Sequence, residues 1–342
     1  MSDFAKPTLD DVARAAGVST ATVSRCLNAP DRVIAPTRER VMKAVEALGY
    51  TPDFGGRALA SRRTNTVGAI IPTMDNAIFA RGLQSFQEAL SKFGKTLLVA
   101  SSGYSPARER EQMEVMAGRG VDGMLLIGSA RPDSSVDFLR RRGIPFLGAW
   151  NLGDAEGYFV GFDNHAAAAE LTRMVLDKGH RRLGMIAGIS QMNDRAADRM
   201  EGVRATAERA GIARTQLPVI EAAYTFDDGA RAFGELMALS PRPTAVLCGN
   251  DVLAVGAMQK ARELGLGVPE DVSITGFDDI DLASVVAPKL TTIRVPHRRM
   301  GEAAAEMLIK LINKQPVERQ IEIPTAIVER DTLGPPPVDH SA

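Results

Sequence analysis

Apolar residues near the start of the chain recur at helical spacing. Three short segments each place their apolar side chains on one face: Leu9, Val12, Ala13 and Ala16; then Val23 and Leu27; then Val41, Val45 and Leu48. The pattern predicts three short amphipathic helices, each with one buried face.

Capping residues mark where these helices begin and end. Thr8 and Asp11 have the spacing of a capping box, and Gly17 supplies the positive φ that closes the first helix. Ser19 can cap the second helix, and Gly49 follows the third. Two helices joined by a short glycine turn, with a third behind them, predict a helix-turn-helix domain.

From residue 67 onward, short apolar runs alternate with amphipathic segments. Nine runs are typical of buried strands: 67–72, 96–101, 123–127, 145–148, 160–162, 183–187, 219–221, 245–249 and 273–277. Eight segments have helical spacing: about 79–93, 108–119, 135–142, 165–178, 197–210, 228–239, 253–264 and 298–312. The fold class is therefore α/β, an all-α head followed by two doubly wound lobes of parallel strands that face one cleft.

Composition agrees with this division. A chain of 342 residues with 45% hydrophobic and 24% charged residues can form two or three compact units. The net charge is −1, and it divides into +3 for residues 1–63 and −4 for the remainder. A mildly basic head permits phosphate binding, although the bias is small.

Cysteine usage and the termini bear on the compartment. Cys26 and Cys248 have no paired or metal-type spacing, and two thiols in so long a chain indicate a reducing compartment. The N-terminal residues lack the apolar core of an export signal, and no stretch approaches 18 uncharged apolar residues. We expect a cytoplasmic protein with no membrane partner.

The second predicted helix carries side chains suited to DNA. Its inward positions leave Thr20, Ala21, Ser24 and Arg25 facing out. Arginine can grip guanine O6 and N7 together, and alanine or a threonine methyl can touch a thymine methyl. The short polar side chains suit phosphate oxygens: Thr22, Ser24 and Asn28. A small helical domain with merely solvated hydroxyls remains the alternative.

The segment TLDDVARAAGVSTATVSRCLN resembles the N-terminal signature of the lactose-repressor (LacI/GalR) family of bacterial transcription regulators. The continuation TRERVMKAVEALGYTPDFGGRALAS resembles the third helix, the Gly-Tyr-x-Pro turn and the hinge of that family. The resemblance implies that Thr20, Ala21 and Arg25 contact bases in the major groove. It also implies that Thr22 and Asn28 contact the DNA backbone.

Residues 53–63 form a candidate hinge helix. Gly55 and Gly56 each cost roughly 1 kcal/mol of helix stability relative to alanine, so this short segment should not hold a helix alone in water. The resemblance implies that Leu59, with Ala60 beside it, wedges into the minor groove when two hinges meet on DNA. A plain linker is the alternative.

The later part of the chain resembles the periplasmic sugar-binding fold by which this family senses effectors. That fold crosses between its lobes three times, here near residues 163–164, 292–294 and 324–326. The resemblance implies a head of 1–52 and a discontinuous body: one lobe of about 64–163 and 293–324, the other of about 164–292 and 325–334. The tail, 335–342, has three consecutive prolines and no apolar heptad, so we expect disorder there and a homodimer.

Polar residues at strand ends are candidate effector contacts. Asp278 follows SITGF, Asn250 and Asp251 follow AVLCG, and Arg199 lies in a predicted helix after a polar loop. Carboxylates, amides and arginine can pair with adjacent sugar hydroxyls, and aromatic rings can stack on a sugar. The resemblance maps effector contacts onto Asp75, Asn76, Phe79, Asp163, Asn193, Arg199, Tyr224, Asn250 and Asp278. A capping or loop-stabilising role is the alternative, weighed most for Asp163 and Asp251.

The effector is expected to be a sugar or sugar acid. The segments VGFDN, YTFDDG and GFDDID are similar to segments of repressors of gluconate utilisation. Arg195 beside Arg199 could bind an anionic effector. A nucleobase or nucleoside is the alternative effector. A stand-alone sugar-binding protein would share the body but would need an export signal and no head.

Signals for catalysis are weak. Gly118–Gly123 matches G-x-G-x-x-G but lies after a helix and before a strand, the reverse of the order that places phosphate on a helix N-terminus. The sequence has no G-x-S-x-G motif and no P-loop. The four histidines are scattered: His165, His180, His297 and His340. We therefore expect no enzyme, no cofactor and no metal site.

Overall fold

The structure is a computed structural model that describes residues 6–51, 63–75, 77–154 and 156–338. Its contacts divide the chain into two compact units, residues 1–64 and 65–342. Most of the expected hinge, with Leu59 and Ala60, lies outside the described residues, as does Asn76. The expected tail is described as far as Val338, and Pro336 lies close to Gly179.

The first unit contains the three predicted helices. They are α1 (Leu9–Ala16), α2 (Thr20–Asn28) and α3 (Ala35–Leu48), with the short 3₁₀ turn η1 (Pro30–Arg32) after α2. The capping box is formed, because the Asp11 N–H donates to Thr8 Oγ1 and the Thr8 N–H donates to the Asp11 carboxylate. Gly17 ends α1 at φ +62°, which favours glycine. The predicted helix-turn-helix order is confirmed.

A small core holds these helices together. Its buried residues are Val12, Ala13, Ala16, Val23, Cys26, Val41 and Ala44. Leu9, Val18 and Leu27 pack against it from the rim. The apolar faces read from the sequence therefore meet as predicted, and burial on one face leaves the other side of α2 free.

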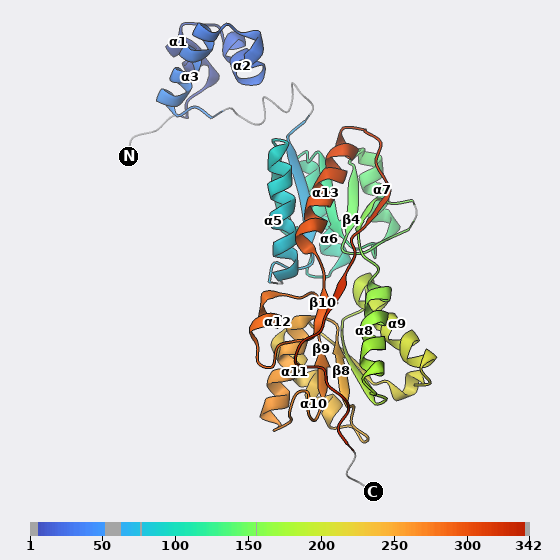
Figure 1. Ribbon diagram of the computed structural model, residues 1–342. Coiled ribbons are helices and arrows are strands. Elements are labelled where there is room, and N and C mark those ends of the chain that lie inside the picture. Colours follow the sequence, from blue (N-terminus) through green and yellow to red (C-terminus); the bar gives the residue numbers. More distant parts are fainter. Residues whose placement is uncertain (1–5, 52–62, 76, 155, 339–342) are drawn as a thin grey trace. The chain divides into compact units, whose positions relative to one another are not determined.

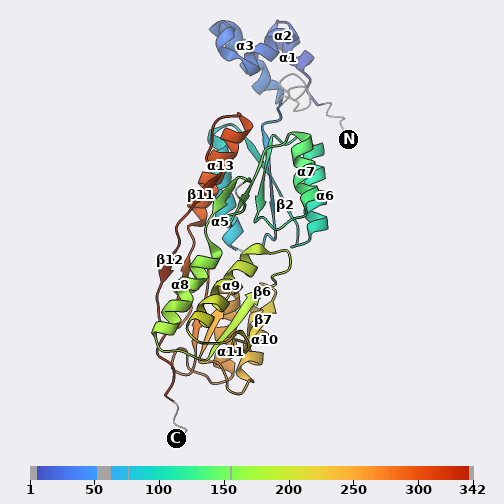
Figure 2. The ribbon, with the colours of Figure 1, turned by 90° about the vertical axis from the view of Figure 1, so that its right-hand side faces the viewer.

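The second unit begins with a six-stranded parallel sheet (Figure 1). Its strands are β1 (Thr66–Ile71), β2 (Thr96–Ser101), β3 (Gly123–Ile127), β4 (Phe146–Ala149), β5 (Phe159–Gly161) and β11 (Gln320–Glu322), in the order β11-β5-β4-β3-β1-β2. Its helices are α5 (Ala77–Lys92), α6 (Pro106–Gly118), α7 (Asp133–Arg142) and α13 (His297–Ile312). Figure 2 shows α5 and α13 on one face of the sheet and α6 and α7 on the other. We call this part the first lobe.

The second lobe is built on a four-stranded parallel sheet. Its strands are β6 (Leu183–Gly188), β7 (Val219–Ala222), β8 (Ala245–Cys248) and β9 (Ser273–Thr275), in the order β7-β6-β8-β9. Its helices are α8 (Asn164–Asp177), α9 (Asp194–Arg209), α10 (Phe226–Met237), α11 (Asp251–Glu263) and α12 (Asp281–Val285), with the 3₁₀ turn η2 (Arg214–Gln216). Helix α8 packs on α9 and α10 packs on α11, so both faces of the sheet are covered.

Short strands join the lobes. β10 (Thr292–Arg294) and β12 (Ala326–Val328) pair antiparallel with each other. The sequence predicted chain crossings at these two places but neither strand, and it also missed β11 and α12. Each of these elements has five residues or fewer, too few to show a period in the sequence.

The strand order of each sheet determines which loops lie at the expected ligand site. In each sheet the order reverses beside the first strand, between β1 and β3 and between β6 and β8. Ligands of doubly wound folds bind beyond the carboxyl ends of the strands at such a switch point. The loops after these strands therefore define where a site between the lobes should lie.

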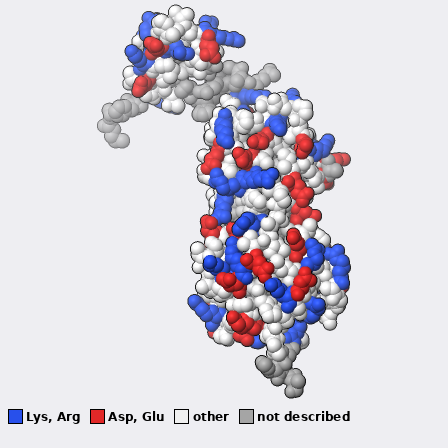
Figure 3. Space-filling view, in the orientation of Figure 1, with Lys and Arg blue, Asp and Glu red and all other residues white. Residues whose placement is uncertain are grey.

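The surface of the body mixes charges of both signs. On the face shown in Figure 3, acidic and basic side chains are interspersed over both lobes. Within the described residues, no helix is long and apolar enough to cross a membrane. Cys26 and Cys248 are both buried and free.

Candidate functional site

The outward side of α2 is the candidate DNA-reading surface. Ala21 and Arg25 are exposed, whereas Thr20, Thr22 and Ser24 are partly buried. The Thr22 hydroxyl lies 2.9 Å from the Ser19 hydroxyl, which caps the helix. Asn28 is the last residue of α2. An arginine and a methyl group one turn apart on an open helix face can reach base edges in a major groove.

A small cavity lies where the loops of the two lobes meet. Its lining residues are Ile78, Phe79, Tyr104, Trp150, Asn193, Arg195, Arg199, Tyr224, Asn250 and Asp278. Each follows the carboxyl end of a strand, as the strand order requires. The cavity has a volume of about 20 Å³, room for about one water molecule. The two lobes are therefore closed around it.

Arg199 forms the polar floor of this cavity. It is 5% exposed, and its Nε donates to Asn164 Oδ1 (2.8 Å) while Nη1 donates to the Gly249 carbonyl oxygen (2.7 Å). Its guanidinium carbon lies 3.7 Å from the centroid of the Phe277 ring, and Nη2 lies 3.6 Å from Asp278 Oδ1. These contacts fix the cation in place and leave Asp278 beside it rather than tightly paired with it.

Several buried polar atoms in and beside the cavity lack hydrogen-bond partners. Of four buried side-chain atoms without a hydrogen bond in the described part of the chain, three belong to residues at this site: Asn193 Oδ1, Asp278 Oδ1 and His297 Nε2. Trp150 Nε1 donates to His297 Nδ1 (3.1 Å), so Nδ1 is the accepting nitrogen and Nε2 carries the proton. The site thus offers two acceptors and one donor. Unpaired buried groups are costly and suit a bound ligand.

Burial shifts the ionisation of these groups. Burial raises the pKa of Asp278 to about 6, although Arg199 and Arg195 oppose the shift. Burial, with Arg199 and Arg81, lowers the pKa of His297 to about 3. The histidine is therefore neutral near pH 7, and the aspartate is mostly ionised.

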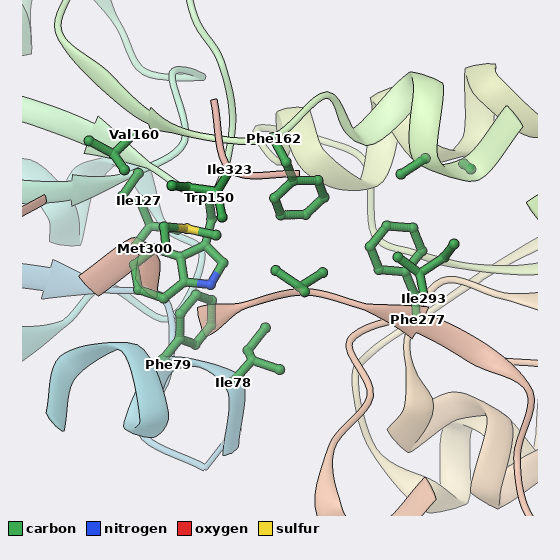
Figure 4. Close-up of a cluster of buried hydrophobic side chains, with 14 of the residues drawn as sticks. Ile78, Phe79, Ile127, Trp150, Val160, Phe162, Phe277, Ile293, Met300 and Ile323 are labelled. Carbon is green, nitrogen blue, oxygen red and sulfur yellow. The ribbon is translucent and has the colours of Figure 1, made fainter. Parts of the chain in front are cut away.

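Aromatic rings form the apolar side of the cavity. Trp150 and Phe79 are 1% and 2% exposed and meet edge to face, with ring centroids 5.6 Å apart (Figure 4). Tyr104 and Tyr224 approach from opposite lobes, with centroids 6.0 Å apart. A ring-shaped ligand with a polar rim matches such walls.

Backbone strain gathers here as well. Of the seven non-glycine residues with positive φ in the described ranges, Tyr104, Trp150 and Asp278 line the cavity, at +59°, +67° and +111°. Residues in such conformations persist where the surroundings enforce them, and they cluster at ligand sites.

Comparison with known proteins identifies the family. A model of bacterial regulatory proteins of the lacI family matches residues 8–53, and one of the periplasmic binding protein-like domain matches residues 172–333. The transcriptional repressor PurR of Klebsiella pneumoniae (strain 342) is 33% identical over 339 residues, 97% of this chain and 99% of the relative. CytR of Escherichia coli (strain K12), also a transcriptional repressor, is 35% identical over 313 residues, 91% of each chain. The chain belongs to the LacI family.

A solved structure of the same family confirms the fold class. The Lac repressor dimer bound to operator and the anti-inducer ONPF has a TM-score of 0.86 at 25% identity, covering 96% of this chain and all of that one. The chain is thus a LacI-family transcriptional regulator with a helix-turn-helix head and a periplasmic-binding-protein-like body.

The structure of this LacI-family regulator brings together six of the predicted effector residues: Phe79, Asn193, Arg199, Tyr224, Asn250 and Asp278. Two others do not line the cavity. Asp75 is exposed and its N–H bonds Thr73, while Asp163 is exposed and caps α8 by accepting from the Ala166 N–H. For Asp163 this is the capping role that we weighed as the alternative.

Other site residues were not expected from the sequence. Tyr104, Trp150 and Ile78 line the cavity, and His297 reaches it through Trp150. Arg195, which the sequence had offered beside Arg199 for an anionic effector, lines the cavity too. Helix α9 begins at Asp194, one turn earlier than predicted, and so places Arg195 and Arg199 on one face. The sequence signal for this pairing is the spacing of four positions between Arg195 and Arg199, which places both on one face of a helix that begins at Asp194.

Within the described residues, no group of three or more His, Cys, Asp or Glu side chains could hold a metal ion. Gly118 ends α6 and Gly123 begins β3, so the G-x-G-x-x-G segment lies between a helix and a strand. That order does not place phosphate at a helix N-terminus.

Proposed function

We propose that this chain is a homodimeric repressor that binds a pseudo-palindromic operator in double-stranded DNA and is controlled by a small effector held between its lobes. The role involves no catalysis and belongs in the cytoplasm. The head of about 1–52 reads DNA, residues 53–63 act as the hinge, and the body of about 64–334 binds effector and partner subunit.

One observation carries the effector proposal. Asn193 Oδ1 and Asp278 Oδ1 at the cavity, and His297 Nε2 behind its Trp150 wall and 3.9 Å from Asp278 Oδ1, are buried without hydrogen-bond partners. Each hydroxyl of a sugar both donates and accepts, so neighbouring hydroxyls can satisfy two acceptors and one donor together. The rings of Trp150 and Phe79 supply an apolar wall for the ring face.

Two arginines favour a sugar acid such as gluconate among the sugars. Arg195 and Arg199 both line the cavity, and Arg195 pairs with Asp194 at 2.8 Å. A carboxylate would gain charge-assisted hydrogen bonds from such cations. The flat walls of Phe79, Trp150 and Tyr224 favour a nucleobase or nucleoside as the second candidate, since planar rings stack on them.

The proposed control uses the closed cavity. A ligand changes the population of lobe orientations only through its unequal affinity for them. Residues 53–63 contain two glycines and should form a helix only with outside support, so a small change in the spacing of two hinges can decide whether they fold on DNA. In this mechanism Leu59 enters the minor groove when the hinges are helical.

A thermal-shift panel tests the effector class. The full chain is heated with sugars, sugar acids including D-gluconate, nucleobases and nucleosides. A ligand that binds the folded chain raises the unfolding temperature, and the rise grows with the logarithm of its concentration relative to its Kd. Asp163→Ala should keep the response, because Asp163 caps a helix outside the cavity. A response to nucleobases alone would replace the sugar proposal with the second candidate.

Operator binding tests the head. Arg25→Ala should cost about 1–3 kcal/mol on the operator and relax base preference at one position. Arg40→Ala on α3 removes the same charge from another exposed site and is the matched control. Equal losses for Arg25→Ala on operator and random DNA would contradict a base-reading role.

A further inference from the structure

Tyr104 separates two cavities. The first is the effector cavity of about 20 Å³, and the second, of about 30 Å³, is lined by Ser102, Ser105, Glu109 and Met192, among others. Tyr104 and Arg195 line both. Neither cavity alone can hold more than about two water molecules, so an organic ligand must displace part of a wall.

Most walls of the effector cavity are fixed. Trp150, Phe79 and Asp278 are at most 2% exposed, and Arg199 is hydrogen-bonded to Asn164 and Gly249. Arg195 is 8% exposed and held by Asp194. Close-packed and hydrogen-bonded side chains resist displacement, because moving them loses contacts that a small ligand does not replace.

The side chain of Tyr104 is placed differently. It is only partly buried, and it borders the empty space of the second cavity as well as the effector cavity. Its backbone is anchored on both sides, by the Gly103 N–H to the Pro72 carbonyl oxygen (2.8 Å) and the Ser105 N–H to the Ser102 carbonyl oxygen (3.1 Å). Rotation of the side chain is therefore its available movement.

We infer that Tyr104 is a movable partition whose ring must turn away from the effector cavity, toward the second cavity, before an organic effector can enter, and that it sets the size of ligand the site accepts. The ring meets Tyr224 of the other lobe, so its position also depends on lobe closure. A site that is competent in only part of the population binds more weakly by that fraction. The inference deepens the proposed effector site and rests on it for the identity of the cavity.

The single tryptophan of the chain gives a test that needs no effector. Trp150 lines the same cavity and is 1% exposed, so its fluorescence reports whether a solute can reach the site. The full chain is titrated with acrylamide, and the quenching constant of Trp150 is compared among variants. Tyr104→Asn removes the ring and retains a residue that tolerates a φ of +59°.

We expect Tyr104→Asn to raise the quenching constant roughly twofold or more, because the closed population is reduced. Tyr104→Phe keeps the ring and should match the wild type. Met192→Ala is the matched control, since Met192 lines the second cavity alone and also has a positive φ, +55°. Tyr104→Gly, which suits the backbone equally well, is the second variant should the asparagine protein not fold.

An unchanged quenching constant in Tyr104→Asn, or an equal rise in Met192→Ala, overturns the inference. An equal rise in Tyr104→Phe would assign the barrier to the hydroxyl and overturn it as well. A thermal-shift panel without any response would contradict the proposed effector class instead, and the quenching result would stand apart from it.

Discussion

Two buried aspartates lie at the ends of neighbouring strands in the second lobe, and their surroundings differ. Asp251 follows β8 and Asp278 follows β9, and each is 1% exposed. Asp251 accepts from the Ile280 N–H (2.8 Å) and the Thr292 hydroxyl (2.6 Å), whereas Asp278 Oδ1 has no hydrogen-bond partner. The same residue in the same kind of position thus holds the fold together in one case and is available to a ligand in the other.

The contacts of Asp251 explain its structural role. They connect the start of α11 to the loop before α12 and to β10, which joins the lobes. Burial, followed by the nearby charge of Asp278, raises the pKa of Asp251 to about 8. A carboxyl group with two donors in place stabilises these segments even though burial disfavours its charge.

The largest expected effect is that of Asp251→Ala on stability. The change leaves the Ile280 N–H and the Thr292 hydroxyl unpaired, at roughly 1–3 kcal/mol each. Urea unfolding should show the loss as a lower midpoint with an unchanged slope. Asp251→Asn is the control, because an amide can accept from Ile280 and donate to Thr292. A stable alanine variant would contradict the structural role.

The pH dependence of stability follows from the raised pKa of Asp251. Between its ordinary value of 3.8 and about 8, the folded chain binds this proton more tightly than the unfolded chain. The contribution of Asp251 to the free energy of unfolding therefore falls as pH rises through that window. Urea midpoints at several pH values should decline less steeply in Asp251→Asn. Asp278→Asn should remove a smaller decline in stability, the one that Asp278 itself contributes between pH 3.8 and about 6.

Asp278→Asn should affect ligand binding more than folding. It replaces an acceptor by a donor in the cavity and removes the charge 3.6 Å from Arg199. We expect effector affinity to fall about 10- to 100-fold, or roughly 1.4–2.7 kcal/mol, with operator binding in the absence of effector retained. Calorimetric titration with the best ligand of the thermal-shift panel measures this, and an unchanged affinity would place Asp278 outside the site.

Asp163→Ala should have the smallest effect. Removing the cap of α8 costs about 0.5–2 kcal/mol of stability. Effector affinity should not change, since the carboxylate faces solvent and binds the Ala166 N–H. A loss of affinity without a loss of stability would return Asp163 to the ligand site.

Local features of this chain could be read from its sequence. The pairing of Thr8 with Asp11 and the turn at Gly17 depend on residues three to five positions apart, so the local sequence is enough to predict them. The strands of both sheets, apart from β11, were predicted for the same reason. Asp278 and Arg199 were predicted from their places after an apolar strand and a polar loop, and the family resemblance mapped effector contacts onto both.

The remainder of the site depends on contacts between distant segments. Trp150 and His297 are 147 positions apart, and their hydrogen bond follows from β10 leading into α13. Which of residues 163 and 164 faces the site depends on the residue at which α8 begins. Asp163 caps that helix and faces solvent, while Asn164 is turned inward to Arg199. The spacing of apolar residues in a sequence does not determine the first residue of a helix to within one position.

The two cysteines are distributed one to each compact unit. Cys26 lies in the core of the head and Cys248 in the core of the second lobe, at 3% and 4% exposure. A thiol reagent can reach either sulfur only when the surrounding core opens, so the labelling rate of each cysteine reports local opening of its own unit. Each unit of the chain therefore has its own labelling site, and the rate of opening of the head can be measured at Cys26 while Cys248 shows that the body stays closed.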